Sequence, residues 1–200
     1  ITIDGKLSES EWENAQLVRD FLTVYPNDKS SPKYKTEVRF FSNEKGIYFG
    51  FLNEQPIETQ TPLKHPRDKW FVDADRNLIM IDFDANSNAG YEFSVTLGDT
   101  LRDAIWTNEN EKSGSWDAIW FAKTHQTESA WYSEFFIPWE VAPMNVVAEK
   151  ERSIKVSFFR KHHSENKFYN FPGLWSEQSP FLSKFSYLKV KNPKNIKSSR

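Results

Sequence analysis

The feature that most limits how this chain can fold is an apolar pattern that repeats every second residue in one segment after another. Charged Glu37 and Arg39 alternate with apolar Val38 and Phe40, and an apolar run at residues 47–52 follows a turn-forming segment. Further β-rich runs cover residues 78–83, 91–97, 118–123, 131–137, 154–160 and 185–190. No long segment repeats with the helical period of about 3.6 residues. The pattern predicts an all-β fold, an antiparallel β-sandwich of about eight short strands.

One short helix is expected near the N-terminus. Ser8 and Glu11 have the spacing of a capping box, in which each side chain accepts a hydrogen bond from the backbone N–H of the other residue. Such a helix would carry Trp12 into the core.

Three segments are too polar or too rich in proline to be regular strands. They cover residues 53–75, with three prolines, residues 107–115, and residues 161–183, with Pro172, Gly173 and Pro180. Long loops on a sandwich are where binding residues usually lie. We therefore expect any binding site in these loops.

Composition excludes several classes of function. The chain has 26 Lys and Arg against 28 Asp and Glu, a net charge of −2, which argues against a protein that binds duplex nucleic acid. It has no cysteine, so it has no disulfide scaffold, no cysteine-bound zinc and no thiol nucleophile. No apolar run approaches the roughly 18 residues of a membrane-spanning helix.

We expect one domain, a sandwich over residues 1–190, followed by a basic linker over residues 191–200. From residue 189 onward the chain has five cations and no acidic residue, as well as a proline and two serines. That composition is typical of a linker to a downstream segment, and a frayed terminus would look the same. The chain starts at Ile1 without a signal-peptide pattern, which suggests a processed product or an excised fragment.

Ten short motifs, spread over nearly the whole chain, together resemble a known family. They are IDGKL (3–7), EWENA (11–15), TEVR (36–39), GIYFGF (46–51), DFD (82–84), YEFSV (91–95), RDA (102–104), SWDAIW (115–120), WYSEFFIP (131–138) and FFR (158–160). In this order and spacing they resemble the family 9 carbohydrate-binding modules, particularly the version at the N-terminus of the DUF5916 proteins of Gram-negative bacteria.

The resemblance implies a jelly-roll-like or immunoglobulin-like sandwich and a non-catalytic domain of a larger exported protein. It implies that the domain binds a sugar or glycan end, that it is periplasmic, outer-membrane-associated or at the cell surface, and that a barrel-like segment follows it. The sugar-binding members of the family hold a terminal sugar between two tryptophans, and several bind calcium.

Loop tryptophans are the first candidates for a sugar site, because indole faces stack on the C–H patches of sugars. Trp70 and Trp175 lie in expected loops beside charged and amide residues, and both fall near the positions of the family's two tryptophans. Arg102, Asp103 and Trp106 complete the expected ligand-binding set. The alternative is that each loop tryptophan only anchors its loop to the sandwich. The other tryptophans are expected to be structural: Trp12, Trp116, Trp120, Trp131 and Trp139.

Acidic residues around one strand suggest a structural calcium ion, which prefers six to eight oxygen ligands. The candidates are Asp73, Asp75 and Asp84, the last at the start of a loop rich in Asn and Ser. A plain hairpin loop is the alternative. No organic cofactor is expected.

Two charged residues are expected to be buried. Glu134 lies among aromatic residues, and Arg160 follows two phenylalanines. We expect them to pair, or each to meet a polar partner such as Arg102 or Asp103, because an unpaired buried charge is costly.

No catalytic motif is present, so we do not expect an enzyme. Two other functions remain open. One is a structural or interaction module that packs on the downstream segment. The other, weaker, is a haem-binding sandwich, for which the His and Met candidates are His65, His125, His162, His163, Met80 and Met144.

Overall fold

The computed structural model describes residues 1–69 and 73–194. Within them, the chain forms thirteen strands and four single-turn 3-10 helices. The strands are β1 (Gln16–Val18), β2 (Leu22–Tyr25), β3 (Thr36–Ser42), β4 (Gly46–Glu54), β5 (Arg76–Asp82), β6 (Ala89–Thr96), β7 (Leu101–Thr107), β8 (Glu111–Ser113), β9 (Phe121–Gln126), β10 (Ala130–Pro138), β11 (Glu151–His162), β12 (Lys167–Phe171) and β13 (Ser186–Lys191). The 3-10 helices are η1 (Ser10–Trp12), η2 (Ile57–Thr59), η3 (Trp139–Val141) and η4 (Leu182–Lys184).

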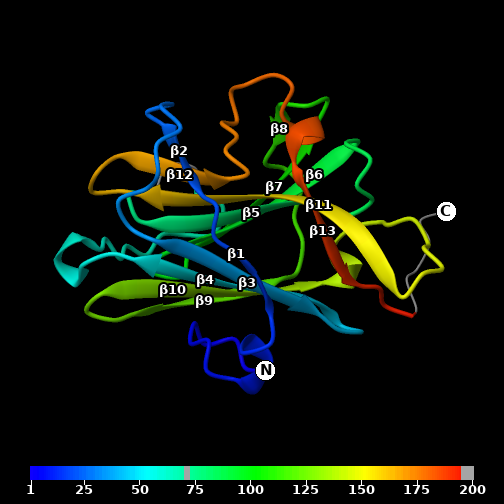
Figure 1. The fold of residues 1–200 in the computed structure, drawn as a ribbon, viewed down its shortest axis with the longest axis horizontal. Coiled ribbons are helices and arrows are strands. Elements are labelled where there is room, and N and C mark those ends of the chain that lie inside the picture. Colours follow the sequence, from blue (N-terminus) through cyan, green and yellow to red (C-terminus); the bar gives the residue numbers. More distant parts are fainter. Residues whose placement is uncertain (70–72, 195–200) are drawn as a thin grey trace.

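The strands form two antiparallel sheets that pack face to face, which confirms the predicted all-β sandwich. The small sheet has the order β1-β3-β4-β10-β9. The large sheet has the order β2-β12-β11-β5-β6-β7-β8, and β13 pairs with β11. Figure 1 shows the two sheets as separate layers, the large one above the small one.

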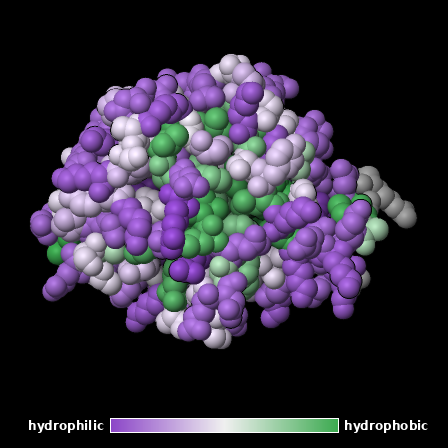
Figure 2. Space-filling model, viewed as in Figure 1, coloured by the Kyte–Doolittle hydropathy of each residue, from purple (hydrophilic) through white to green (hydrophobic). Residues whose placement is uncertain are grey.

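The main core fills the space between the layers. Because strand side chains alternate between faces, Phe49 and Phe51 of β4 point toward Ile79 and Ile81 of β5 and toward Phe158 of β11. All five side chains are buried. From the side shown in Figure 2, hydrophobic residues gather in the middle of the molecule and hydrophilic residues surround them.

The short N-terminal helix is a single 3-10 turn, η1, and the predicted capping box is wrong. The cap position is Glu9 rather than Ser8, and no side chain caps the turn. The carboxylate of Glu11 instead accepts a hydrogen bond from its neighbour Ser10, at 3.4 Å. A capping box needs a longer helix, whereas here Trp12 already ends the turn by entering the core, where it is 2% exposed.

Two strands lie where loops were expected. The segment 161–183 contains β12, and the segment 107–115 contains β8. In β12, Tyr169 and Phe171 face the main core, while Phe168 packs on the opposite face against Trp175. Apolar residues on both faces hide the period of two that identified the other strands.

The sandwich extends beyond residue 190, so the predicted domain boundary lies a few residues too early. Lys191 ends β13, and the side-chain amide of Asn192 donates to the backbone oxygens of Val147, at 2.7 Å, and Glu149, at 2.9 Å. Pro193 is buried. In the described part of the chain, no helix is long and apolar enough to cross a membrane.

Glu134 and Arg160 are both buried but do not pair with each other. Glu134 accepts hydrogen bonds from the backbone N–H groups of Asp4 and Gly5, each at 3.0 Å. Arg160 donates to the backbone oxygens of Lys35 (3.2 Å) and Glu54 (2.6 Å) and to the side-chain oxygens of Thr36 (3.0 Å) and Gln55 (3.2 Å). The expected partners Arg102 and Asp103 are not used, because backbone groups of neighbouring segments lie closer.

Candidate functional site

The outer face of the large sheet carries a second hydrophobic core. Leu78 and Met80 of β5, Phe159 of β11 and Trp106 of β7 point away from the small sheet and pack together there. The segment 172–185, which includes η4, covers them with further apolar residues, among them Leu174, Phe181, Leu182 and Phe185. Figure 1 shows this segment in orange to red above the large sheet.

Two side chains hold the covering segment in place by accepting hydrogen bonds from its backbone. Asn170 Oδ1 accepts from the N–H groups of Gly173 (2.9 Å) and Leu174 (2.6 Å). Glu109 Oε2 accepts from those of Phe181 (2.8 Å) and Ser183 (3.0 Å). The segment therefore has a defined position although it pairs with no strand.

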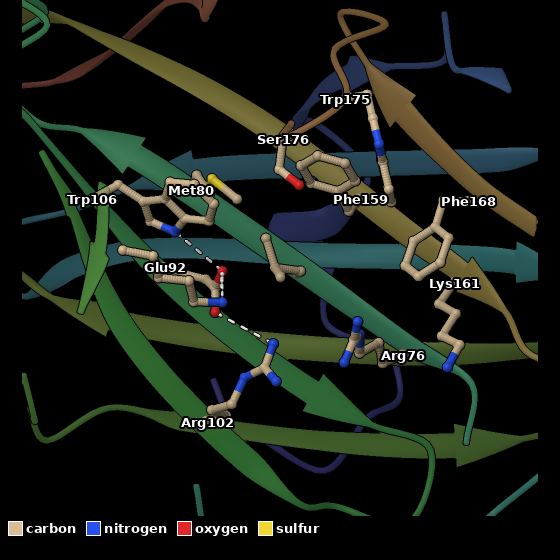
Figure 3. A pocket seen from close by; sticks show the side chains of 12 residues that line it. Arg76, Met80, Glu92, Arg102, Trp106, Phe159, Lys161, Phe168, Trp175 and Ser176 are labelled. Atoms are coloured by element: carbon tan, nitrogen blue, oxygen red, sulfur yellow. Dashed lines mark hydrogen bonds and ion pairs between the residues drawn. The ribbon is translucent and has the colours of Figure 1, made fainter. Parts of the chain in front are cut away.

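A pocket of about 130 Å³ lies beside this covering segment, on the same outer face. It is lined by Arg76, Leu78 and Met80 of β5, Glu92 of β6, Arg102 and Trp106 of β7, Lys112 of β8, Phe159 and Lys161 of β11, Phe168 of β12, and Trp175 and Ser176. Figure 3 shows these side chains converging on one space from neighbouring strands of the large sheet and from the covering segment. Its volume is well below the roughly 300–1,000 Å³ of sites for drug-sized ligands, so it suits one small ring or substituent.

Aromatic rings form two sides of the pocket. Trp175 is half-buried, and its ring lies 5.2 Å from that of Phe168 and 5.7 Å from that of Tyr25. Trp106, on the other side in Figure 3, is only 6% exposed. Its indole Nε1 donates to Glu92 Oε1 at 3.2 Å. The sequence placed Trp106 beside a loop, whereas it belongs to β7 and to the second core.

Among the described residues of the pocket lining, Glu92 is the one acidic residue, and it is 1% exposed. Lys112 Nζ lies 2.9 Å from its Oε1, and an Arg102 nitrogen lies 3.5 Å from its Oε2. Burial lowers the pKa of Lys112, and the charge of Glu92 opposes that shift. The carboxylate of Glu92 therefore already has two cations and an indole around it.

Two further cations, Arg76 and Lys161, lie at the other end of the pocket. They are cross-strand neighbours, directly opposite each other on β5 and β11. The guanidinium of Arg76 and the ammonium of Lys161 each lie 5.8 Å from the ring centre of Phe168. Burial and the charge of Arg102 lower the pKa of Arg76 to about 10, against the opposing effect of Glu92, so it stays cationic at neutral pH.

The structure brings together three of the five predicted ligand-binding residues. Trp175, Arg102 and Trp106 all line the pocket. Asp103 does not, because successive strand residues face opposite ways. It accepts hydrogen bonds from Trp120 Nε1 (2.9 Å) and an Arg67 nitrogen (2.8 Å). Trp70 lies outside the described residues.

The three aspartates predicted to bind calcium are not brought together. Asp75 and Asp84 flank opposite ends of β5, and Asp73 is exposed. The carboxylate of Asp75 is buried and accepts hydrogen bonds from neutral donors only, those of Gln55, Thr61 and His163. That of Asp84 binds Arg152 at 3.0 Å. These oxygens do not fit one shared calcium ion.

Another carboxylate cluster was not anticipated. Oxygens of Asp68, Asp103 and Asp117 lie within 4.8 Å of one another. Nitrogens of Arg67 lie 2.8 Å from Asp103, 3.1 Å from Asp117 and 3.6 Å from Asp68, so one guanidinium pairs with all three carboxylates. The cluster is therefore an ion-pair network.

Sequence reasoning missed Arg76, Glu92 and Lys161. Each is a charged residue at an outward-facing position of a strand whose inward-facing positions are mostly apolar. That is the ordinary pattern of a half-solvated strand, so it does not by itself single out a site.

The fold, but not the sequence, has recognisable relatives. No family model matches the chain, and no curated protein matches its sequence. A family 9 carbohydrate-binding module from Caldicellulosiruptor kristjanssonii, solved with cellotriose, superimposes with a TM-score of 0.65 at 12% identity, over 98% of this chain and 91% of the other. A structure of such a module from that organism, solved with glucose, gives a TM-score of 0.61 at 14% identity, over 98% of this chain and 94% of the other.

A third solved structure, a proposed carbohydrate-binding protein from Bacteroides uniformis, gives a TM-score of 0.63 at 12% identity, over 90% of this chain and 88% of the other. At these identities the likeness establishes the fold. The chain therefore has the fold of family 9 carbohydrate-binding modules.

Proposed function

We propose that the domain is a non-catalytic carbohydrate-binding module, and that its site is the pocket beside Trp175. Solved modules with this fold carry cellotriose or glucose, which supports a saccharide as the class of ligand. The observation that carries the proposal is the makeup of the pocket. A half-buried indole lies beside charged side chains in a space of about 130 Å³. A sugar needs that combination, because its C–H face stacks on the ring and its hydroxyls need polar partners.

Substitution of Trp175 tests this function. On an array of neutral and acidic glycans, read with and without calcium, we expect the wild type to bind and Trp175→Ala to lose at least about tenfold in affinity, as for a central aromatic contact. Trp175→Phe should keep part of the binding. Tyr187→Ala, which removes a 66% exposed ring on β13, is the matched control and should bind normally. A wild-type domain that binds no glycan would refute the proposal.

The cellular setting is a further part of the proposal. We place the domain in an exported, envelope-associated protein of the DUF5916 type, with a barrel-like segment downstream, on the strength of the sequence motifs alone. Fractionation of cells that produce the full-length protein tests this, and recovery in the cytoplasm would contradict it. Calcium binding stays a prediction, which titration of the domain with calcium chloride tests.

A second function, that of an interaction module, has its own supporting observation. The outer face of the small sheet carries a row of stacked rings across four strands, Phe41, Tyr48, Phe136 and Phe121, with centroid distances of 4.9, 4.7 and 6.2 Å. Phe121, on strand β9, is 50% exposed, and nearby Ile119 is 80% exposed. If the domain mainly packs on another segment, Phe121→Ser should abolish that association and Trp175→Ala should affect only stability.

The haem alternative has less support. Among the described residues, no histidine lines the pocket, and Met80 there is 2% exposed. Met144 is also buried, in the main core. A Soret band in the purified protein would nevertheless establish haem binding.

A further inference from the structure

The pairing of β5 with β11 places two cations directly opposite each other in the pocket. Arg76 is the Cα partner of Lys161, and both side chains point to the outer face of the large sheet. Phe168 is the next cross-strand neighbour, opposite Lys161 on β12. Figure 3 shows Arg76, Lys161 and Phe168 together on one side of the pocket.

Such a pair is unfavourable by itself, because like charges directly opposite each other destabilise a sheet. Neither cation has a carboxylate within ion-pair distance among the described residues. Asp73 and Asp75 act on Lys161 only from farther away, and its pKa is lowered, first by burial and then by the charge of Arg76.

The acidic residue of the pocket does not neutralise this pair. Glu92 directly contacts Lys112, Arg102 and the indole of Trp106. The part of the lining that the structure describes therefore holds four cations and one carboxylate. The excess positive charge lies in a partly buried space, where an anion would interact more strongly than in water.

We infer that the saccharide bound here is acidic, and that Arg76 and Lys161 bind its anionic group. This inference rests on the proposed function and specifies its ligand. The shared chemistry is a negatively charged sugar substituent, either the carboxylate of a uronic acid or a sulfate ester. A guanidinium presents two parallel N–H donors to such a group, and an ammonium adds a second charge.

The pocket has room for this arrangement. The anionic group would lie between Arg76 and Lys161, beside the ring of Phe168. The sugar ring would then lie toward Trp175, whose ring is 5.2 Å from that of Phe168. A space of about 130 Å³ suits one sugar unit, so an acidic end or side branch is the expected epitope.

The test is calorimetric titration of the protein with matched sugars. Glucose, glucuronic acid and glucose 6-sulfate form one set, and galactose, galacturonic acid and galactose 6-sulfate the other. Acetate and inorganic sulfate are the sugar-free probes. We expect an acidic member to bind at least tenfold more tightly than its neutral counterpart and than the free anions. Its affinity should fall as salt is raised, because salt screens the charges.

Substitutions locate the effect. Arg76→Gln and Lys161→Gln should each reduce the preference for the acidic sugar over its neutral counterpart at least tenfold. The matched controls are Arg19→Gln, whose side chain is 60% exposed, and Lys189→Gln, exposed on β13, and both should behave as wild type. Without ligand, neither pocket variant should lower the melting temperature, since each removes a like-charge repulsion.

The outcomes separate the two claims. Binding of neutral sugars as tightly as acidic ones would overturn this inference and leave the proposed function standing. Equal binding of free sulfate and of sulfated sugar would overturn both, because the site would then bind only the anion. Pocket variants that melt below the controls and keep the acidic preference would show that the pair is structural, which also overturns the inference.

Discussion

At the scale of single residues, Glu134 stands out because it is fully buried and, among the described residues, no cation lies within ion-pair distance of its carboxylate. Its Oε2 accepts hydrogen bonds from the backbone N–H groups of Asp4 and Gly5, so it joins the N-terminal segment to β10. Gly5 has a positive φ of 83°, and an added Cβ would lie 2.5 Å from the backbone carbon of Thr124. Only glycine lets the chain pass there, close enough to reach the carboxylate.

This environment predicts that stability falls with rising pH. Burial raises the pKa of Glu134 from 4.5 to about 7, against the effect of its two backbone hydrogen bonds. The native state therefore binds this proton more tightly than the unfolded chain does. The resulting stabilisation is present in full below about pH 4.5 and is lost as the pH rises through about 7. It amounts to something on the order of 3 kcal/mol.

Urea unfolding between pH 5 and 8 measures this effect. The side chain of Glu134→Gln cannot ionise but keeps an oxygen for the two N–H groups. Between pH 5 and 8 the wild type should lose about 3 kcal/mol more of its free energy of unfolding than this variant does. Glu140→Gln, at an exposed position of η3, should follow the wild type. Parallel pH profiles for wild type and Glu134→Gln would show that the buried carboxyl does not titrate in this way.

At the scale of elements, a buried pair of amides joins the two sheets across the core. Asn53 of β4 and Asn77 of β5 are fully buried and exchange two hydrogen bonds, of 2.9 and 2.8 Å, across the core. Ser133 of β10 adds a third, to Asn77, at 2.7 Å. Apolar side chains tolerate small shifts of one sheet over the other, whereas these amides pair in one arrangement only.

A double-mutant cycle measures how strongly the two amides are coupled. Asn53→Leu and Asn77→Leu should each cost about 1–3 kcal/mol, because each removes both hydrogen bonds of the pair and leaves the other amide buried with fewer partners. The double variant should cost less than the sum, with a coupling of about 0.5–3 kcal/mol by urea unfolding. The control cycle combines Asn77→Leu with Asn88→Leu, an exposed position, and should be additive. Additivity in both cycles would mean that the amides do not act as a unit.

At the scale of the whole molecule, the protein has two cores of different construction. The main core lies between two hydrogen-bonded sheets. The second lies between the large sheet and the segment 172–185, whose backbone is held by the side chains of Asn170 and Glu109. Because this segment belongs to no sheet, the second core should open at a lower free energy than the main one.

Hydrogen exchange read by mass spectrometry tests this order. Amides of 172–185 should exchange before those of β5 and β11, and a bound saccharide should slow them, because the pocket lies beside this segment. Glu109→Ala removes the acceptor of two of its N–H groups and should speed exchange there and leave β5 unchanged. Glu128→Ala, at an exposed position, is the control. If the amides of 172–185 exchange as slowly as those of β5, the second core does not open before the main one, and the prediction is wrong.

The strands that sequence reasoning found are those with one apolar face and one polar face, such as the part of β3 around Val38 and Phe40. It missed β12, since the second core makes both of its faces apolar, and β8, a strand of three residues. The candidate pocket was anticipated in part. The sequence singled out Trp175 by its local chemistry, whereas Arg76 and Lys161 became a pair only through the register of β5 on β11.

The sequence by itself determined that this protein is a layered β structure with a core rich in aromatic residues, because alternation and burial depend on residues close together in the chain. The tertiary structure alone decided which strands became neighbours, that the segment 172–185 covers the outer face of the large sheet, and that Trp175 meets a surplus of positive charge there. The physical reason is range. The apolar pattern of a strand depends on residues that are close together in the chain, whereas strand pairing joins residues that are far apart. The net charge of the pocket depends on several such pairings at once.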